Sequence, residues 1–318
     1  MQISLNRLTR ICRGHSHNAF GDVVYFRQRL LVCYRQGTHH MSDDGCVIIA
    51  EINEQGLPER FQRLFSTEGD LRDPHFCVVG DRLYLLAHQR WSAVLGKAKT
   101  YSWFSGDGVS WSTRHDPGPD NWWLWRATTY NNQQWGLAYH RPSEQLDLFA
   151  GNLRGKMHCA KTAVLSKQQH GLGYPNESDC CFTDSGELIA VVRRDADSFS
   201  AQLGRSKPPY RHWDWQDLGC YIGAPALLCL NQNTAIIAGR HYNGKRLVTQ
   251  LWQLAIHSGE ISELIKLPSG GDNSYPGITR IGNQLFVAYY SSHVDNQSRM
   301  YLARLDVETE YLDVIKQG

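Results

Sequence analysis

The chain has 318 residues, 42% of them hydrophobic, and a formal net charge of +2 at pH 7. This balance excludes the polybasic field with which many proteins attract nucleic acid. No apolar run reaches the ~18 residues that a membrane-spanning helix requires, so we expect no membrane span.

Residues 1–16 form an N-terminal segment without the apolar core of a secretory signal. We therefore expect a cytoplasmic protein from the chain as given, or a secreted or periplasmic one if a signal has been removed. Within this segment Gln2–Leu8 alternates weakly between apolar and polar residues. It is a candidate strand for closing a ring of sheets, since a closed ring leaves no sheet edge open.

Residues 17–318 contain six short apolar runs that each end in a charged or aromatic residue. The ends lie 53, 52, 53, 47 and 50 residues apart. The runs are Leu30–Arg35, Leu83–His88, Trp135–His140, Leu188–Arg193, Ala235–Arg240 and Leu285–Tyr290. A period of 40–50 residues in a strand-rich chain is typical of a β-propeller with one four-stranded sheet per repeat.

Short strand-turn-strand units fill each repeat, and helical periodicity is almost absent. An example is Phe76–Val79 and Leu83–Ala87, joined by a turn at Gly80-Asp81. The nine cysteines show no C-x-x-C spacing, and their odd number argues against a disulfide framework. We predict an all-β protein, a single-domain six-bladed β-propeller that occupies residues 17–318.

A second marked position lies 14 to 18 residues before each run's end: His17, Asp73, Arg126, Glu177, Ala224 and Tyr275. In a blade the first strand lies nearest the axis and the second runs antiparallel to it. The start of the first strand and the end of the second therefore share one face. We expect Asp73, Arg126, Glu177 and Tyr275 to share one funnel with the run ends, which are Arg35, His88, His140, Arg193, Arg240 and Tyr290.

Segments along almost the whole chain resemble a sialidase-like propeller family, commonly labelled exo-α-sialidase-like. They are His17-Asn18-Ala19-Phe20, Tyr34-Arg35-Gln36-Gly37 with His40, Asp70-Leu71-Arg72-Asp73, Trp123-Leu124-Trp125-Arg126, Gly173-Tyr174-Pro175-Asn176-Glu177, Arg193-Arg194-Asp195, Gln202-Leu203-Gly204 with Pro208-Pro209-Tyr210, and Ser274-Tyr275 with Tyr289-Tyr290-Ser291-Ser292-His293. The segment from Ser105 to Trp111 resembles the Asp-box of sialidases, one residue short.

The resemblance implies a tyrosine nucleophile, Tyr275, activated by Glu177, with Asp73 as the acid/base. It also implies that arginines hold a substrate carboxylate. We predict substrate-binding roles for Arg35, Arg72, Arg126, Arg193, Arg240, His17, His40, His88 and His140. The first-blade arginine of sialidases is missing, because His17-Asn18-Ala19-Phe20 occupies that region. Arg35 or Arg126 is then expected to supply the missing charge.

Residue chemistry agrees with an acidic sugar as substrate. A planar guanidinium offers a carboxylate two parallel charge-assisted hydrogen bonds, and clustered arginines repel one another unless an anion or an acidic side chain lies between them. For Asp73, burial would raise the pKa and the neighbouring Arg72 would lower it, so the two effects oppose.

Two other functions stay open at this point. One is a lyase or glycosidase that acts on uronic-acid glycans through histidine, tyrosine and arginine. The other is a non-catalytic carbohydrate-binding propeller. The histidines lack an H-x-x-x-H or comparable spacing, so we expect no metal site and no cofactor. The expected partner is an acidic carbohydrate, and the expected state is a monomer.

Overall fold

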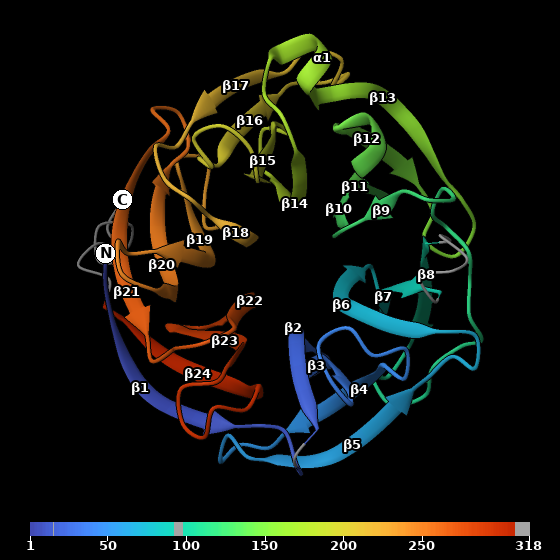
Figure 1. Ribbon diagram of the computed structural model, residues 1–318, viewed down its shortest axis with the longest axis vertical. Coiled ribbons are helices and arrows are strands. Elements are labelled where there is room, and N and C mark those ends of the chain that lie inside the picture. Colours follow the sequence, from blue (N-terminus) through green and yellow to red (C-terminus); the bar gives the residue numbers. More distant parts are fainter. Residues whose placement is uncertain (15, 92–97, 309–318) are drawn as a thin grey trace, which may run out of the picture.

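The computed structural model describes residues 1–14, 16–91 and 98–308. In these ranges six antiparallel sheets stand as blades around a central axis, which confirms the predicted six-bladed propeller (Figure 1). The described part holds one α-helix, the four-residue α1 (Lys167–His170). None of its helices is long and apolar enough to cross a membrane.

Blades one to three are formed by strands that follow one another along the chain. Blade one contains β2 (His17–Phe26), β3 (Arg29–Gly37), β4 (Cys46–Ile52) and β5 (Pro58–Leu64). Blade two contains β6 (Asp70–Val79), β7 (Arg82–Arg90) and β8 (Ala98–Ser105). Blade three contains β9 (Trp123–Leu124), β10 (Thr128–Tyr130), β11 (Gln133–His140), β12 (Gln145–Gly151) and β13 (Met157–Ser166).

Blades four to six repeat the same order of strands. Blade four contains β14 (Pro175–Phe182), β15 (Leu188–Arg194), β16 (Gln202–Ser206) and β17 (Asp214–Asp217). Blade five contains β18 (Gly223–Cys229), β19 (Thr234–Tyr242), β20 (Leu247–Ala255) and β21 (Glu260–Leu267). Blade six contains β22 (Asn273–Ile281), β23 (Gln284–Ser291) and β24 (Arg299–Glu308).

The first strand of the chain completes the last blade. β1 (Gln2–Arg10) pairs antiparallel with β24, from Gln2 opposite Glu308 to Arg10 opposite Tyr301. Blade six thus takes its outermost strand from one end of the chain and its other three from the far end (Figure 1). This pairing joins the first and last repeats and leaves no open edge between them.

The core lies between the blades, where the second strands are covered on both faces. Ile189 and Val191 of β15 pack with Ile237 of β19 in one such layer, between blades four and five. Strands buried on both sides have no solvent face to alternate with. This is why the sequence shows continuous apolar runs in place of a period of two.

The start of the inner strand is irregular in five blades, where the register with the second strand shifts. In four of them the bulged residue has a positive φ: Phe20 (55°), Asp73 (48°), Ala224 (46°) and Tyr275 (48°). A left-handed conformation costs a non-glycine residue roughly 1–2 kcal/mol. Bulges of this kind are common next to active sites, where they change the direction in which a side chain points. The residue of blade one that corresponds to Asp73, Ala224 and Tyr275 is therefore Phe20, whereas the sequence spacing marked His17.

Neighbouring inner strands are linked by a disulfide that the sequence did not lead us to expect. Cys181 of β14 and Cys229 of β18 are bonded, with their Cα atoms 6.3 Å apart and 48 residues between them. That separation is close to one repeat, so the two cysteines occupy similar positions in adjacent blades. The other seven cysteines are free, which agrees with the absence of a disulfide framework.

Candidate active site

Tyr275 and Glu177 meet at the channel end where the inner strands begin. The Tyr275 hydroxyl donates a hydrogen bond of 2.5 Å to Oε1 of Glu177. Nη1 of Arg193 donates both to Oε2 of Glu177 (2.5 Å) and to the Tyr275 oxygen (3.0 Å). The structure thus brings together a phenol, a carboxylate and a guanidinium, all three predicted from the sequence.

Backbone groups hold Glu177 in this orientation. Its Oε2 also accepts a hydrogen bond of 2.9 Å from the amide of Ala224, the bulged residue of blade five. Its own amide donates to the side chain of Asn176 at 2.7 Å. Glu177 is only 7% exposed, so the position of its carboxylate is fixed by contacts and not by solvent.

The Tyr275 ring lies in an aromatic setting. Its ring centre lies 5.1 Å from that of Phe20 and 6.0 Å from that of Trp125. The guanidinium carbon of Arg240 lies 4.8 Å from the centre of the Tyr275 ring. Burial and the negative charge of Glu177 raise the pKa of Tyr275, while Arg193 and Arg240 oppose that rise. The phenol is therefore protonated at neutral pH, and its hydrogen bond is directed at the Glu177 carboxylate.

Asp73 adds a second carboxyl group to this end of the channel. It is 4% exposed, and Nε of Arg72 donates to its Oδ2 at 3.0 Å. Burial raises the pKa of Asp73 to about 6, with Glu177 adding to the rise and Arg72 opposing it. Of the two opposing effects expected from the sequence, burial is the stronger. A carboxyl group with this pKa can donate a proton near neutral pH.

Three arginines surround these groups, and each is paired with an acidic side chain. Arg193 donates from Nε to Asp195 at 2.9 Å, and Arg240 donates from Nη2 to Asp272 at 3.0 Å. Arg72 pairs with Asp73 as described, and its guanidinium lies 4.9 Å over the Phe20 ring. The cluster is therefore not repulsive on its own, and its charge alone does not demand an anionic ligand.

Each of these arginines nevertheless keeps one terminal nitrogen without a protein partner. These three nitrogens donate no hydrogen bond to any acceptor in residues 1–14, 16–91 and 98–308: Nη2 of Arg72, Nη2 of Arg193 and Nη1 of Arg240. None of the three is a buried unsatisfied atom, so all three face accessible space. We call Arg72, Arg193 and Arg240 the arginine clamp.

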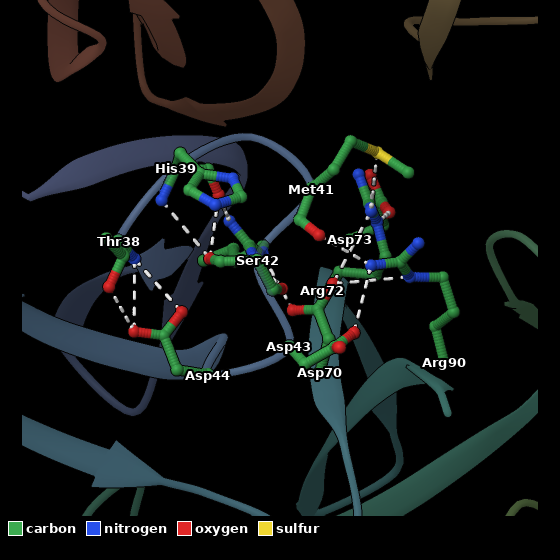
Figure 2. Close-up of polar contacts among 11 residues, drawn as sticks. Thr38, His39, Met41, Ser42, Asp43, Asp44, Asp70, Arg72, Asp73 and Arg90 are labelled. Carbon is green, nitrogen blue, oxygen red and sulfur yellow. Dashed lines mark hydrogen bonds and ion pairs between the residues drawn. The ribbon is translucent and has the colours of Figure 1, made fainter. Parts of the chain in front are cut away.

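Arg35 does not belong to the clamp, although the sequence suggested it. Its side chain is 0% exposed and pairs with Asp70 at 2.7 Å, and its other nitrogens donate to His39 and Ser42. Figure 2 shows how Asp70, Arg72, Asp73 and Arg90 gather beside the loop that carries residues 38–44. A completely buried, fully paired arginine has no donor for a ligand, which contradicts the predicted substrate role of Arg35.

Arg126 also has a structural environment. It pairs with Asp22 at 3.2 Å, lies 3.9 Å from Asp179, and donates to the carbonyl of Pro276 at 2.7 Å. It lines a cavity of about 620 Å³ formed by the later halves of the inner strands, away from their starts. Arg126 is therefore engaged by protein groups of blades one, four and six, which argues against its supplying the missing first-blade charge.

Two of the four predicted histidines lie outside this group of residues. The His88 ring is buried and stacks 3.7 Å from that of Trp123, and burial lowers its pKa well below the usual value. His140 bonds to Ser143 at 2.8 Å and stacks on Trp122. His17 and His40 do lie beside Phe20, with ring centres 6.3 and 5.2 Å from it. A mechanism built on all four histidines is thus not supported.

Sequence reasoning missed two residues of the site. Phe20 packs edge-on against both Tyr275 and Tyr290. Asp272 accepts from both Arg240 and Tyr290, the latter at 2.7 Å. The only signal for Asp272 was its place three residues before Tyr275, since its pairing with Arg240 spans 32 residues.

No family model matches the sequence, and no curated protein matches it. Solved structures do share the fold. A protein of unknown function from Dyadobacter fermentans superposes with a TM-score of 0.83 at 16% identity, over 96% of this chain and 99% of that one. The Hadza microbial sialidase Hz136 gives 0.69 at 13% identity, over 90% of this chain and 65% of the sialidase.

An α-L-arabinanase from Penicillium chrysogenum, complexed with arabinobiose, gives a TM-score of 0.68 at 13% identity over 91% of this chain and 93% of the arabinanase. Identities this low show the fold alone. The fold of this chain is a sialidase-like six-bladed propeller. The resemblance seen in the sequence is confirmed at that level.

Proposed function

We propose that this protein is a retaining glycoside hydrolase that removes a terminal acidic sugar, such as a sialic acid. The observation that carries the proposal is the hydrogen-bonded group of Tyr275, Glu177 and Arg193. A sialidase and an arabinanase share the fold, and both are glycosidases, which supports the same reaction type here.

In the first step the Tyr275 oxygen attacks the anomeric carbon while its proton passes to Glu177. Asp73, protonated below a pH of about 6, gives its proton to the departing glycosidic oxygen. In the second step a water molecule loses a proton to Asp73 and displaces Tyr275, which recovers its proton from Glu177. Two displacements at one carbon retain its configuration.

A tyrosine suits an anionic substrate better than a carboxylate nucleophile does, because the phenol is neutral before it reacts. The free terminal nitrogens of the arginine clamp are the proposed ligands of the substrate carboxylate. In this assignment Arg72 of blade two supplies the charge that sialidases take from their first-blade arginine.

We assign the rest of the substrate to a cavity between blades four and five. The lining of this cavity of about 810 Å³ includes Arg193, Tyr221, Phe199 and Tyr242. Phe199 and Tyr242 are 51% and 53% exposed, and Phe199 has a φ of 57°. Exposed aromatic faces suit sugar rings, so we assign the leaving group to this cavity.

A neutral sugar is the second candidate substrate, because every clamp arginine already has an acidic partner. Aryl glycosides of sialic acid, of a uronic acid and of arabinofuranose distinguish the possibilities. We expect release of the aryl group from the sialoside alone, and a covalent adduct on Tyr275 when a fluorinated acidic-sugar analogue is used. Turnover of the arabinoside without the sialoside would replace the acidic substrate by a neutral one. Binding of free acidic sugar without turnover would make the protein a lectin.

A further inference from the structure

Two histidines and an aspartate that are far apart in sequence meet at the rim of the candidate active site. His17 begins β2, His40 lies in the loop between β3 and β4, and Asp272 directly precedes β22. One ligand atom from each lies within 4.8 Å of the other two. We propose that His17, His40 and Asp272 bind a divalent transition-metal ion, with zinc as the best match.

The spacing of His40 and Asp272 fits a shared ion. Nδ1 of His40 and Oδ2 of Asp272 are 3.1 Å apart. Zinc bonds to nitrogen and oxygen are about 2.0–2.2 Å long, so two ligands of a tetrahedral ion lie about 3.3–3.5 Å from each other. An ion can therefore replace the proton that now joins the two groups, with a small adjustment of either side chain.

His17 is prepared to act as a ligand. Its Nδ1 is buried and has no hydrogen-bond partner within the described residues. A ring nitrogen that no protein donor occupies keeps the lone pair that a metal requires.

Groups behind the ligands hold Asp272 in place. Its Oδ1 accepts from the Tyr290 hydroxyl at 2.7 Å and from Arg240 at 3.0 Å, which leaves Oδ2 facing His40. Such outer contacts commonly orient the ligands of protein metal sites.

The loop that carries His40 is also fixed. Asp44 accepts from the amide of Thr38 at 3.0 Å, and the Ser42 hydroxyl donates to the carbonyl of His39 at 2.9 Å (Figure 2). The side chains of His40 and Asp272 are still 46% and 40% exposed. Three protein ligands with an open side resemble zinc sites that keep a position for water or substrate.

An ion here would add positive charge beside Arg240, where it can bind an anionic group of a ligand. This consequence rests on the proposed function, whereas metal binding itself does not. Of the two donor types present, imidazole suits zinc, copper, iron and nickel, and a single carboxylate does not select for calcium or magnesium.

The test is a titration of chelator-treated protein with Zn²⁺ by calorimetry and with Co²⁺ by its visible absorption, without any sugar. We expect one saturable ion and the intense colour of low-symmetry cobalt. His17→Ala, His40→Ala and Asp272→Asn should each weaken binding by at least about 100-fold, since even outer contacts contribute 10–100-fold. His140→Ala is the matched control, because that histidine lies outside the cluster, and it should bind as the parent does.

Binding that survives all three ligand substitutions, or no saturable binding by the parent, would overturn the inference. Anomalous scattering from a zinc-soaked crystal tests the same site without any variant, because it locates the ion directly at His40 or elsewhere. If the ion binds as expected but no glycoside is hydrolysed, the proposed function fails and the metal site stands. If a sialoside is hydrolysed but the parent binds no ion in the titration, only the metal site fails.

Discussion

The phenolic oxygen of Tyr275 lies 2.5 Å from Oε1 of Glu177, although 98 residues of sequence separate the two. The residues start inner strands two blades apart, and the backbone of the intervening blade also contacts Glu177 through the amide of Ala224. Three successive blades therefore hold this hydrogen bond in place. Arg193 donates hydrogen bonds to both Tyr275 and Glu177, so a substitution at any of these three residues should change the contacts of the other two.

Tyr275→Phe removes the proposed nucleophile and leaves the ring. We expect kcat on a sialoside to fall by at least about 100-fold, the lower end of what a positioned proton-transfer group contributes, and covalent trapping to disappear. Tyr289→Phe is the matched control, because the Tyr289 hydroxyl donates to the carbonyl of Pro268 and not to the site. Full turnover by Tyr275→Phe in steady-state assays would exclude the nucleophile assignment.

Arg240→Ala tests whether Arg240 binds the negative charge of the sugar or only maintains the shape of the site. Losing a hydrogen bond to a charged group costs about 1.5–3 kcal/mol, so affinity for the acidic sugar should drop roughly 10- to 150-fold. Affinity for the methyl ester of the same sugar should fall much less, because the ester carries no negative charge. Arg280→Ala, at an exposed position near the end of β22, serves as the control. Equal losses for acid and ester, measured by calorimetry, would give Arg240 a structural role only.

Arg35→Ala should damage stability instead of recognition. The substitution leaves Asp70 completely buried without its closest partner, and breaking a buried ion pair in this way costs about 3–5 kcal/mol. We expect a corresponding drop in the free energy of unfolding in urea. A variant as stable as the parent, with weaker sugar binding, would make Arg35 a substrate ligand after all.

The pKa of Asp73, about 6, predicts the pH dependence. Its acid form dominates below pH 6 and is lost as pH rises, so kcat/KM on substrates with poor leaving groups should fall above about pH 6. This pKa lies above the usual 3.9, so as pH rises the unfolded state loses this proton before the folded state does. The free energy of unfolding should therefore decrease as pH rises from about 4 to 6. Asp73→Asn should abolish both effects. A pH–rate profile that Asp73→Asn leaves unchanged would assign the acid elsewhere.

Phe199→Ala and Tyr242→Ala test the cavity between blades four and five. Each removes an exposed ring, so the fold should be unaffected. We expect KM for a sialylated oligosaccharide to rise roughly 2- to 13-fold per ring, by analogy with aromatic contacts of roughly 0.5–1.5 kcal/mol. KM for a sialyl fluoride, which has no sugar leaving group, should not change. An equal increase in KM for both substrates would show that the leaving group does not bind in this cavity.

Repeat spacing located Glu177, Arg193, Arg240 and Tyr275 correctly at one end of the channel, because a strand register transmits position reliably over a short hairpin. The same spacing could not tell Arg35 from Arg72. Both lie near the same end of neighbouring blades, but Arg35 points to the buried Asp70 and Arg72 keeps a free nitrogen. Which way a side chain turns depends on the bulge at the start of the strand and on its local partners.

The sequence by itself determined the all-β class, the six repeats and the end of the propeller where polar side chains gather. These follow from apolar runs and turns, which act over a few residues and recur with the repeat. Only the tertiary structure decided which arginines form the clamp, that burial outweighs Arg72 at Asp73, and that His17, His40 and Asp272 meet. Pairings between blades, and the burial that shifts a pKa, depend on distances that no local pattern encodes.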